Sequence, residues 1–82
     1  MWFVYVIYNS PNKKFYIGQT GNLENRIAEH NLKRGKHFTS KFDGKWELVY
    51  KEELENKMEA IKREKQLKSF RGREFIKKHI PL

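Results

Sequence analysis

The chain contains no cysteine and no long apolar run. The absence of cysteine excludes a disulfide framework and a thiolate metal site, and this composition fits a cytoplasmic protein. The longest apolar segment, residues 2–8, is too short to span a bilayer, and no cleavage-type signal follows it. We therefore expect a cytoplasmic protein that folds without covalent cross-links.

Acidic residues are also scarce, with 10 Asp and Glu against 18 Lys and Arg and a net charge of +8. Residues 57–82 hold nine basic and three acidic residues, a net of +6, whereas residues 1–56 hold nine and seven, a net of +2. A basic flank on a small domain is typical of proteins that bind a polyanion such as DNA, and a merely solubilising surface is the alternative. The residues expected to contact DNA are Lys62, Lys65, Lys68, Arg71 and Arg73.

The hydropathy pattern predicts one α+β domain over residues 1–82 with the order ββαβαα. Strands are expected at residues 1–8, 15–19 and 46–50, the last extending as far as 53, with a hairpin turn at 9–14 and a loop at 35–45. Helices are expected at residues 23–34 and 56–69, followed by a short terminal helix before Pro81. Asn22 or Thr20 and Asn56 are suited to N-caps, and Gly35 and Gly72 to helix ends. The expected fold is a small three-stranded antiparallel sheet flanked by helices.

Glu64 is an anomaly within its predicted helix. Its neighbours one turn away, Ala60, Ile61 and Leu67, are all apolar, so Glu64 lies on the face that should pack inward. Carboxylates are rarely buried without a partner or a metal ion. Glu64 therefore either pairs with an arginine, reaches solvent at the edge of the core, or binds a metal.

Tyr5, Tyr16, Arg26 and His30 carry groups that could take part in phosphate chemistry. Tyr16 and Gly18 share one face of a strand, and the glycine leaves room for a ligand or a backbone to approach. Arg26 and His30 are neighbours on one helix surface, where a guanidinium suits a phosphate and an imidazole can bind phosphate or transfer a proton. Taken singly, each has an ordinary interpretation as a packing tyrosine, a solvated arginine or a surface histidine.

These residues together resemble the GIY-YIG nuclease superfamily over essentially the whole chain. Phe3-Val4-Tyr5 keeps the tyrosine of the first motif without its leading glycine, and Tyr16-Ile17-Gly18 keeps the second motif intact. Residues 23–30 match the helix that carries the family's arginine, and residues 59–64 match the segment that ends in its metal-binding glutamate. The chain is most similar to small stand-alone bacterial members of the UPF0213 type, which are similar to the amino-terminal part of a repair excinuclease.

The resemblance implies hydrolysis of a DNA phosphodiester with one divalent ion, Mg²⁺ or Mn²⁺, bound by Glu64. It implies that Arg26 neutralises charge on the phosphate, that Tyr5 acts as general base or orients the nucleophile, and that Tyr16 supports the water or the phosphate. His30 belongs to the same catalytic group. We expect Tyr5, Tyr16, Arg26 and Glu64 to converge on one concave surface, with His30 at its rim.

The resemblance also bears on partners, and the chain departs from the family at two positions. The expected substrate is branched or damaged DNA in repair or recombination, with a partner protein supplying specificity. Gln19 stands where repair nucleases carry a lysine, and Ile76 falls near the position of an asparagine found in several catalytic relatives. Two alternatives remain open: a nucleic-acid-binding module without catalysis, and an adaptor that docks on a repair or recombination protein.

Overall fold

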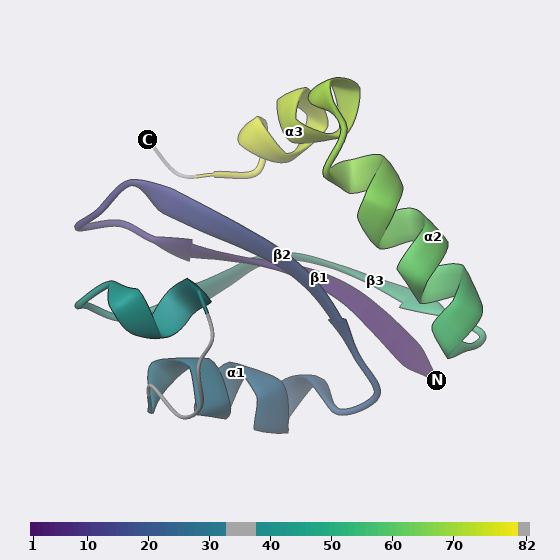
Figure 1. The fold of residues 1–82 in the computed structure, drawn as a ribbon, viewed down its shortest axis with the longest axis horizontal. Helices are drawn as coiled ribbons and strands as arrows, with labels where there is room; N and C mark the ends of the chain where they lie inside the picture. The colour runs from purple at the N-terminus through teal and green to yellow at the C-terminus, as the bar shows by residue number, and fades with distance from the viewer. Residues whose placement is uncertain (33–37, 81–82) are drawn as a thin grey trace.

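A computed structural model describes residues 1–32 and 38–80 of the chain (Figure 1). Its elements are β1 (Trp2–Asn9), β2 (Lys14–Thr20), α1 (Leu23–Asn31), the 3₁₀ helix η1 (Phe38–Lys41), β3 (Glu47–Leu54), α2 (Lys57–Leu67) and α3 (Phe70–Lys77). The three strands form one antiparallel sheet in the order β2-β1-β3. The predicted α+β class and the order ββαβαα are confirmed. Within the described residues, no helix is long and apolar enough to cross a membrane.

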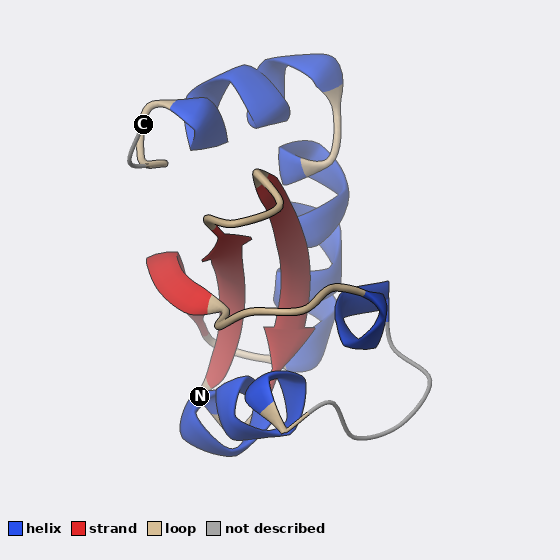
Figure 2. Cartoon of the chain, turned by 90° about the vertical axis from the view of Figure 1, so that its left-hand side faces the viewer, coloured by secondary structure: helices blue, strands red, loops and turns tan. Residues whose placement is uncertain are grey.

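The central strand β1 sends alternate side chains to opposite faces of the sheet, and a separate core forms on each face. Val4 and Val6 pack toward α2 and α3, whereas Tyr5 and Ile7 pack toward α1 and the segment that ends at Trp46. Figure 2 shows the sheet between α1 on one side and α3 on the other. Residues 4–7 are fully buried because both faces of β1 are covered.

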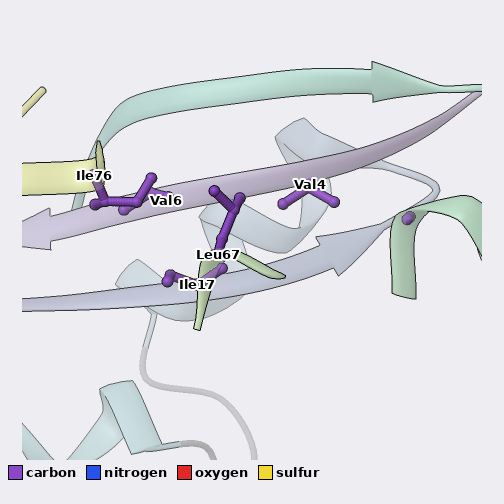
Figure 3. Packing of buried hydrophobic residues seen from close by; sticks show 6 residues of the cluster. Val4, Val6, Ile17, Leu67 and Ile76 are labelled. Carbon is purple, nitrogen blue, oxygen red and sulfur yellow. The ribbon is translucent and has the colours of Figure 1, made fainter. Parts of the chain in front are cut away.

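The larger core joins the sheet to the last two helices (Figure 3). Its buried members are Val4, Val6, Ile17, Ala60, Leu67 and Ile76. Ile76 is 0% exposed, so the position near which some catalytic relatives carry an asparagine is a packing position in this chain.

Asparagine side chains cap the N-termini of two of the helices, as the sequence predicts. The Asn22 side chain accepts a hydrogen bond from the Asn25 amide at 3.1 Å, and Asn56 accepts one from the Glu59 amide at 3.0 Å. The Thr20 hydroxyl instead accepts the Asn22 amide at 3.1 Å, so it supports the cap and does not form it. Helix α1 ends at Asn31, and the predicted stop at residues 33–35 lies outside the described residues.

The boundary between the last two helices differs from the prediction. Helix α2 ends at Leu67, two residues early, and Ser69 caps α3 by accepting the Gly72 amide at 3.2 Å. Gly72 therefore lies inside α3 and does not separate the helices. A Cβ on Gly72 would lie 2.2 Å from the Gln66 carbonyl oxygen, so this glycine permits the close approach of α3 to the end of α2. From the sequence alone, a glycine with this role cannot be distinguished from a glycine that ends a helix.

The junction before β3 also differs from the prediction. Residues 38–41 form η1 within the segment expected to be a loop. Trp46 precedes the third strand, which begins at Glu47 and ends at Leu54. The Asn31 side chain accepts a hydrogen bond from the Trp46 amide at 2.7 Å and donates one to the Trp46 carbonyl at 3.0 Å. These are the backbone groups that Trp46 would need to pair as a strand residue, so β3 begins after it.

A half-buried ion pair fixes α2 on β3 and so positions the helix that carries Glu64. Arg63 Nε lies 3.0 Å from both carboxylate oxygens of Glu52, and Arg63 Nη2 lies 2.9 Å from Glu52 Oε2. The Tyr50 hydroxyl donates to the same carboxylate. Burial acts to raise the pKa of Glu52, but the Arg63 and Tyr50 hydrogen bonds and the Arg63 charge lower that pKa overall.

This ion pair predicts a loss of stability in acid. The folded pKa of Glu52 is depressed, so its contribution is present above the unfolded pKa of about 4.3 and is lost as pH falls through the folded pKa. We expect the free energy of unfolding of Glu52→Gln to be lower than that of wild type at pH 7 and to approach it as pH falls below about 4. Urea unfolding between pH 3 and 7 measures this, with exposed Glu53→Gln as control. A difference in the free energy of unfolding between wild type and Glu52→Gln that stays constant from pH 3 to 7 would contradict this prediction.

Candidate active site

The phenol of Tyr5 lies at the centre of the candidate site. Tyr5 is fully buried on β1, directly opposite Gly18 of β2. A Cβ on Gly18 would lie 2.6 Å from the Tyr5 hydroxyl oxygen and 2.9 Å from Tyr16 Cε2. The space that Gly18 leaves is therefore occupied by the two tyrosine rings, whose centroids are 6.3 Å apart, and not by an open ligand site. Gly18 is the residue that allows Tyr5 to lie across β2.

This packing predicts a catalytic defect in Gly18→Ala. The added methyl would displace the Tyr5 phenol, to which the family resemblance gives the role of general base, and misplacement of such a group by about 1 Å costs on the order of 10²-fold in rate. We expect that loss of cleavage with the fold retained, measured by single-turnover assays and thermal melts. Gly21→Ala is the matched control, because its Cβ would be crowded at 2.7 Å by the Trp2 ring. Equal cleavage by Gly18→Ala and wild type would contradict the proposal that Gly18 positions the Tyr5 phenol.

His30 binds the hydroxyl of Tyr5 inside the protein. His30 Nε2 lies 2.8 Å from the Tyr5 hydroxyl, and His30 Nδ1 lies 2.6 Å from the Thr39 hydroxyl. His30 is 1% exposed, so the expectation that it lies at the rim of the site is wrong. A neutral imidazole has one donor and one acceptor nitrogen, and these two hydroxyls match them. The sequence does not point to Thr39, because it comes from η1, within a segment without periodicity.

The electrostatics of Tyr5 connect it to the other candidate residues. Burial raises the pKa of Tyr5 well above its usual range, and the nearby Tyr16 raises it further. The charge and hydrogen bonding of the Arg26 guanidinium lower this pKa, whereas the Glu64 carboxylate raises it. Tyr5 is therefore a neutral phenol at neutral pH, and of the two charged groups Arg26 acts on its pKa more strongly than Glu64.

Arg26 lies at the open side of this group. It is on α1, and its Nε donates to Glu29 Oε1 at 3.1 Å, with both side chains 37% exposed. An ion pair this exposed contributes little to stability, so the guanidinium can exchange Glu29 for a phosphate. The i,i+3 spacing of Arg26 and Glu29 is a signal for this pair that the sequence contains.

Glu64 comes from α2, which packs on the other face of the sheet from α1. The structure brings Tyr5, Tyr16 and His30 into contact, whereas the convergence of Arg26 and Glu64 on one concave surface stays a prediction. Its neighbours Ala60 and Leu67 are buried and Ile61 is 37% exposed, so Glu64 lies at the edge of the inward face, with its side chain 20% exposed. Glu64 Oε2 accepts a hydrogen bond from Lys68 Nζ at 2.6 Å. Its ion-pair partner is therefore a lysine and not an arginine, and Arg26 and Glu64 each pair with another residue.

Glu64 is also the candidate metal ligand. Among residues 1–32 and 38–80, no group of three or more His, Asp or Glu side chains could hold an ion. A single carboxylate fits Mg²⁺, which keeps several waters and is commonly bound through one or two carboxylates together with substrate phosphates. The donor set thus fits a metal ion that is shared with a phosphate, and not a centre assembled by protein ligands alone.

The five basic residues predicted to contact DNA are exposed along α2 and α3, although some have partners. They are Lys62, Lys65, Lys68, Arg71 and Arg73. Lys62 lies 3.9 Å from Glu59, Lys68 pairs with Glu64, and Arg73 Nε donates to the Lys68 carbonyl at 3.1 Å. Their contact with DNA stays a prediction.

Gln19, the residue that replaces the lysine of repair nucleases, has a structural partner. Its side-chain oxygen accepts a hydrogen bond from the Trp2 indole. Gln19 is half-buried on the edge strand β2, so this residue ties the start of β1 to the end of β2.

Comparisons with known proteins identify the family of the chain. The family model of the GIY-YIG catalytic domain matches residues 1–78. A UPF0213 protein of Staphylococcus haemolyticus is 37% identical over 75 residues, covering 92% of this chain and 89% of the relative. A UPF0213 protein of Clostridium perfringens is 41% identical over 68 residues, covering 83% and 71%. The solution NMR structure of a UPF0213 protein from Bacillus halodurans superposes with a TM-score of 0.54 at 28% identity, covering 93% of this chain and 82% of that one. The chain therefore belongs to the GIY-YIG nuclease family, among the UPF0213 proteins.

Proposed function

We propose that the protein is a divalent-metal-dependent DNA endonuclease that hydrolyses phosphodiester bonds. The observation that carries this proposal is the environment of one buried phenol. The Tyr5 hydroxyl binds His30, and its pKa responds to Tyr16, Arg26 and Glu64. A possible proton acceptor thus binds this hydroxyl directly, and the charge of Arg26 and, least of all, that of Glu64 act on its pKa, whereas a domain that only binds DNA needs no such group.

Arg26 is proposed to bind the phosphate at the scissile bond. The planar guanidinium can donate two hydrogen bonds to two phosphate oxygens, and its partner Glu29 is exposed and easily replaced. As the attacking oxygen bonds to phosphorus, negative charge grows on those oxygens, and the fixed guanidinium stabilises it.

Tyr5 and His30 are proposed to take the proton of the attacking water. Because the pKa of Tyr5 is raised, the phenol is protonated before the reaction and cannot act as a preformed phenolate base. The water transfers its proton to the Tyr5 oxygen as Tyr5 transfers its own proton to His30 Nε2, 2.8 Å away. His30 Nδ1 donates to Thr39 in this arrangement, so the Thr39 hydroxyl sets the required tautomer.

Glu64 is proposed to hold Mg²⁺ or Mn²⁺, which when bound supplies positive charge to the leaving oxygen. The phosphorus–oxygen bond to that leaving group breaks as the bond to the water oxygen forms, and solvent protonates the alkoxide. Before a metal binds, Lys68 neutralises the Glu64 carboxylate. Tyr16 packs 5.1 Å from the His30 ring, measured between centroids, and supports the phosphate or the water at the same place.

The same Lys68 pair supports a second candidate, a nucleic-acid-binding module that has lost catalysis or serves as an adaptor. Lys68 Nζ occupies one oxygen of the proposed metal ligand, and Gln19 supplies no cation where repair nucleases have a lysine. A role in repair or recombination on branched or damaged DNA, with a partner protein giving specificity, extends the first candidate.

One experiment separates the two candidates. Supercoiled plasmid, a three-way junction and a linear duplex are incubated with the protein in Mg²⁺, Mn²⁺ or EDTA, and both mobility shifts and cleavage products are recorded. We expect cleavage that requires the metal, with preference for the junction if the protein acts in repair. Binding to all three DNAs without cleavage in either metal would establish the binding module instead.

A further inference from the structure

A closed ring of hydrogen bonds begins and ends at His30. His30 Nδ1 lies 2.6 Å from the Thr39 hydroxyl. The Trp46 indole Nε1 donates to the Thr39 carbonyl at 3.2 Å. The Trp46 backbone is bound in turn by the Asn31 side chain, with N···O distances of 2.7 and 3.0 Å. Asn31 follows His30 in helix α1, so the contacts return to the residue from which they started.

This ring lies inside the protein. His30, Thr39 and Trp46 are each 1% exposed. Trp46 belongs to the same apolar cluster as Tyr5 and Ile7. A buried hydrogen bond is costly to break, because the groups that it frees find no water to replace the lost partner. The ring is therefore expected to hold one arrangement of its members.

Thr39 depends on the ring for its position. It comes from η1, a 3₁₀ helix of four residues that is not part of the sheet. Its carbonyl accepts two hydrogen bonds, from the Phe42 amide at 3.3 Å and from the Trp46 indole. The first closes the turn of η1 itself, whereas the second joins η1 to a residue that Asn31 holds on α1. Figure 1 shows η1 next to α1.

The position of Thr39 decides which nitrogen of His30 carries the proton. Tyr5 can give its proton to His30 only if Nε2, 2.8 Å from the hydroxyl, is unprotonated. That tautomer carries its proton on Nδ1, where the Thr39 hydroxyl accepts it in a hydrogen bond. If Thr39 moves away, the proton can lie on Nε2 and be donated to Tyr5, and His30 then cannot accept the Tyr5 proton.

We propose that Trp46 and Asn31 are positioning residues that hold Thr39 against His30 and so keep His30 in the tautomer that accepts the Tyr5 proton. Both act through Thr39. The inference deepens the proposed function and rests on it for the role of His30 in cleavage. The sequence predicts Trp46 only as the first residue of a strand and Asn31 only as a residue of a helix.

The test measures the tautomer itself and needs neither DNA nor metal. Long-range hydrogen–nitrogen NMR correlation spectra, recorded above neutral pH, show which imidazole nitrogen is protonated, and His30→Gln assigns the signal. We expect a proton on Nδ1 in wild type and on Nε2 in Thr39→Val. Trp46→Phe keeps a buried ring but loses the indole N–H. It should raise the ratio of the Nε2-protonated form to the other about fivefold or more, the effect of one hydrogen bond.

Ile7→Val is the matched control. Ile7 is 0% exposed in the same cluster, and its shortening lowers stability through lost packing without removing a hydrogen bond. It should lower the melting temperature and leave the tautomer as in wild type. A merely structural role for Trp46 predicts the same result for Trp46→Phe.

The proposal is overturned by a wild-type protein protonated on Nε2, by a folded Trp46→Phe that keeps the wild-type tautomer, or by an equal shift in Ile7→Val. If Trp46→Phe unfolds in a thermal melt, Asn31→Asp decides. Aspartate keeps the acceptor for the Trp46 amide and loses the donor to the Trp46 carbonyl, so the Nε2-protonated form should again increase. An unchanged tautomer in Asn31→Asp would overturn the proposal.

Cleavage rates separate this proposal from the proposed function. At saturating DNA in single-turnover assays, Trp46→Phe should cleave about tenfold or more slowly, as expected for a misplaced proton acceptor. Its DNA affinity and the cleavage rate of Ile7→Val should match wild type. A tautomer shift without slower cleavage would keep the nuclease and overturn the role of the ring. A tautomer shift in a protein that never cleaves would keep the ring and overturn the nuclease.

Discussion

Replacing Arg26 with alanine is expected to slow DNA cleavage by on the order of 10²-fold or more while the protein stays folded. The guanidinium would stabilise charge that develops on the phosphate, and removal of one such donor from an active site has an effect of this size. In its ion pair with Glu29 both side chains are 37% exposed, so the free energy of unfolding should change by less than about 1 kcal/mol. Single-turnover cleavage and a thermal melt measure the two quantities.

Two further variants test the origin of the Arg26 effect. Arg26→Lys keeps the charge but loses the planar fork, so it should recover only part of the rate. Glu29→Gln breaks the same ion pair while keeping the guanidinium, and should cleave at nearly the rate of wild type. If Arg26→Ala unfolds, or if Glu29→Gln is equally inactive, the ion pair is structural and the catalytic role of Arg26 is wrong.

Replacing Glu64 with glutamine is expected to abolish metal-dependent cleavage, a loss of about 10³-fold or more. A divalent ion at a leaving oxygen supplies several kcal/mol of transition-state stabilisation, and glutamine is a poor ligand for Mg²⁺. Glu64 is 20% exposed among buried neighbours, and its partner Lys68 is 47% exposed. Loss of a partly desolvated charge with an exposed partner should leave stability unchanged or slightly higher.

Glu59→Gln is the matched control for Glu64. Glu59 lies on the same helix, is 53% exposed, and has its own lysine, Lys62, at 3.9 Å. It should cleave as wild type does, with the same dependence on Mn²⁺ concentration. A Glu64→Gln protein that is destabilised by roughly 3–5 kcal/mol would instead identify a structural ion pair. Glu64→Gln that cleaves like Glu59→Gln would remove Glu64 from the metal site.

The architecture was predictable because each strand and α-helix had a local signal, whereas η1 had none. A continuous β-rich apolar run predicted the first strand and an alternating pattern predicted the third, and the asparagine N-caps predicted helix starts that the structure confirms. Errors arose where tertiary contacts override such signals. Gly72 is required by the approach of α3 to the end of α2, and the third strand begins one residue late because Asn31 binds the backbone of Trp46.

The candidate site was predictable as a set of residues but not in its detailed contacts. Spacing on a helix placed Arg26 and His30 side by side, yet it did not reveal that His30 turns inward between Tyr5 and Thr39. The burial of His30 depends on which segment covers α1, and the segment that supplies Thr39 has no periodic pattern that would predict its position.

The measurement that tests the central claim most directly is the rate of DNA cleavage in Mn²⁺ by wild type, Arg26→Ala and Glu64→Ala at equal DNA occupancy. Melts first establish that all three are folded, and anisotropy establishes that all three bind. We predict that wild type cleaves plasmid and branched DNA and that EDTA stops it, whereas both variants bind without cleaving. Equal cleavage by all three proteins, or binding without cleavage by wild type, would contradict an active site formed by Tyr5, Arg26 and Glu64.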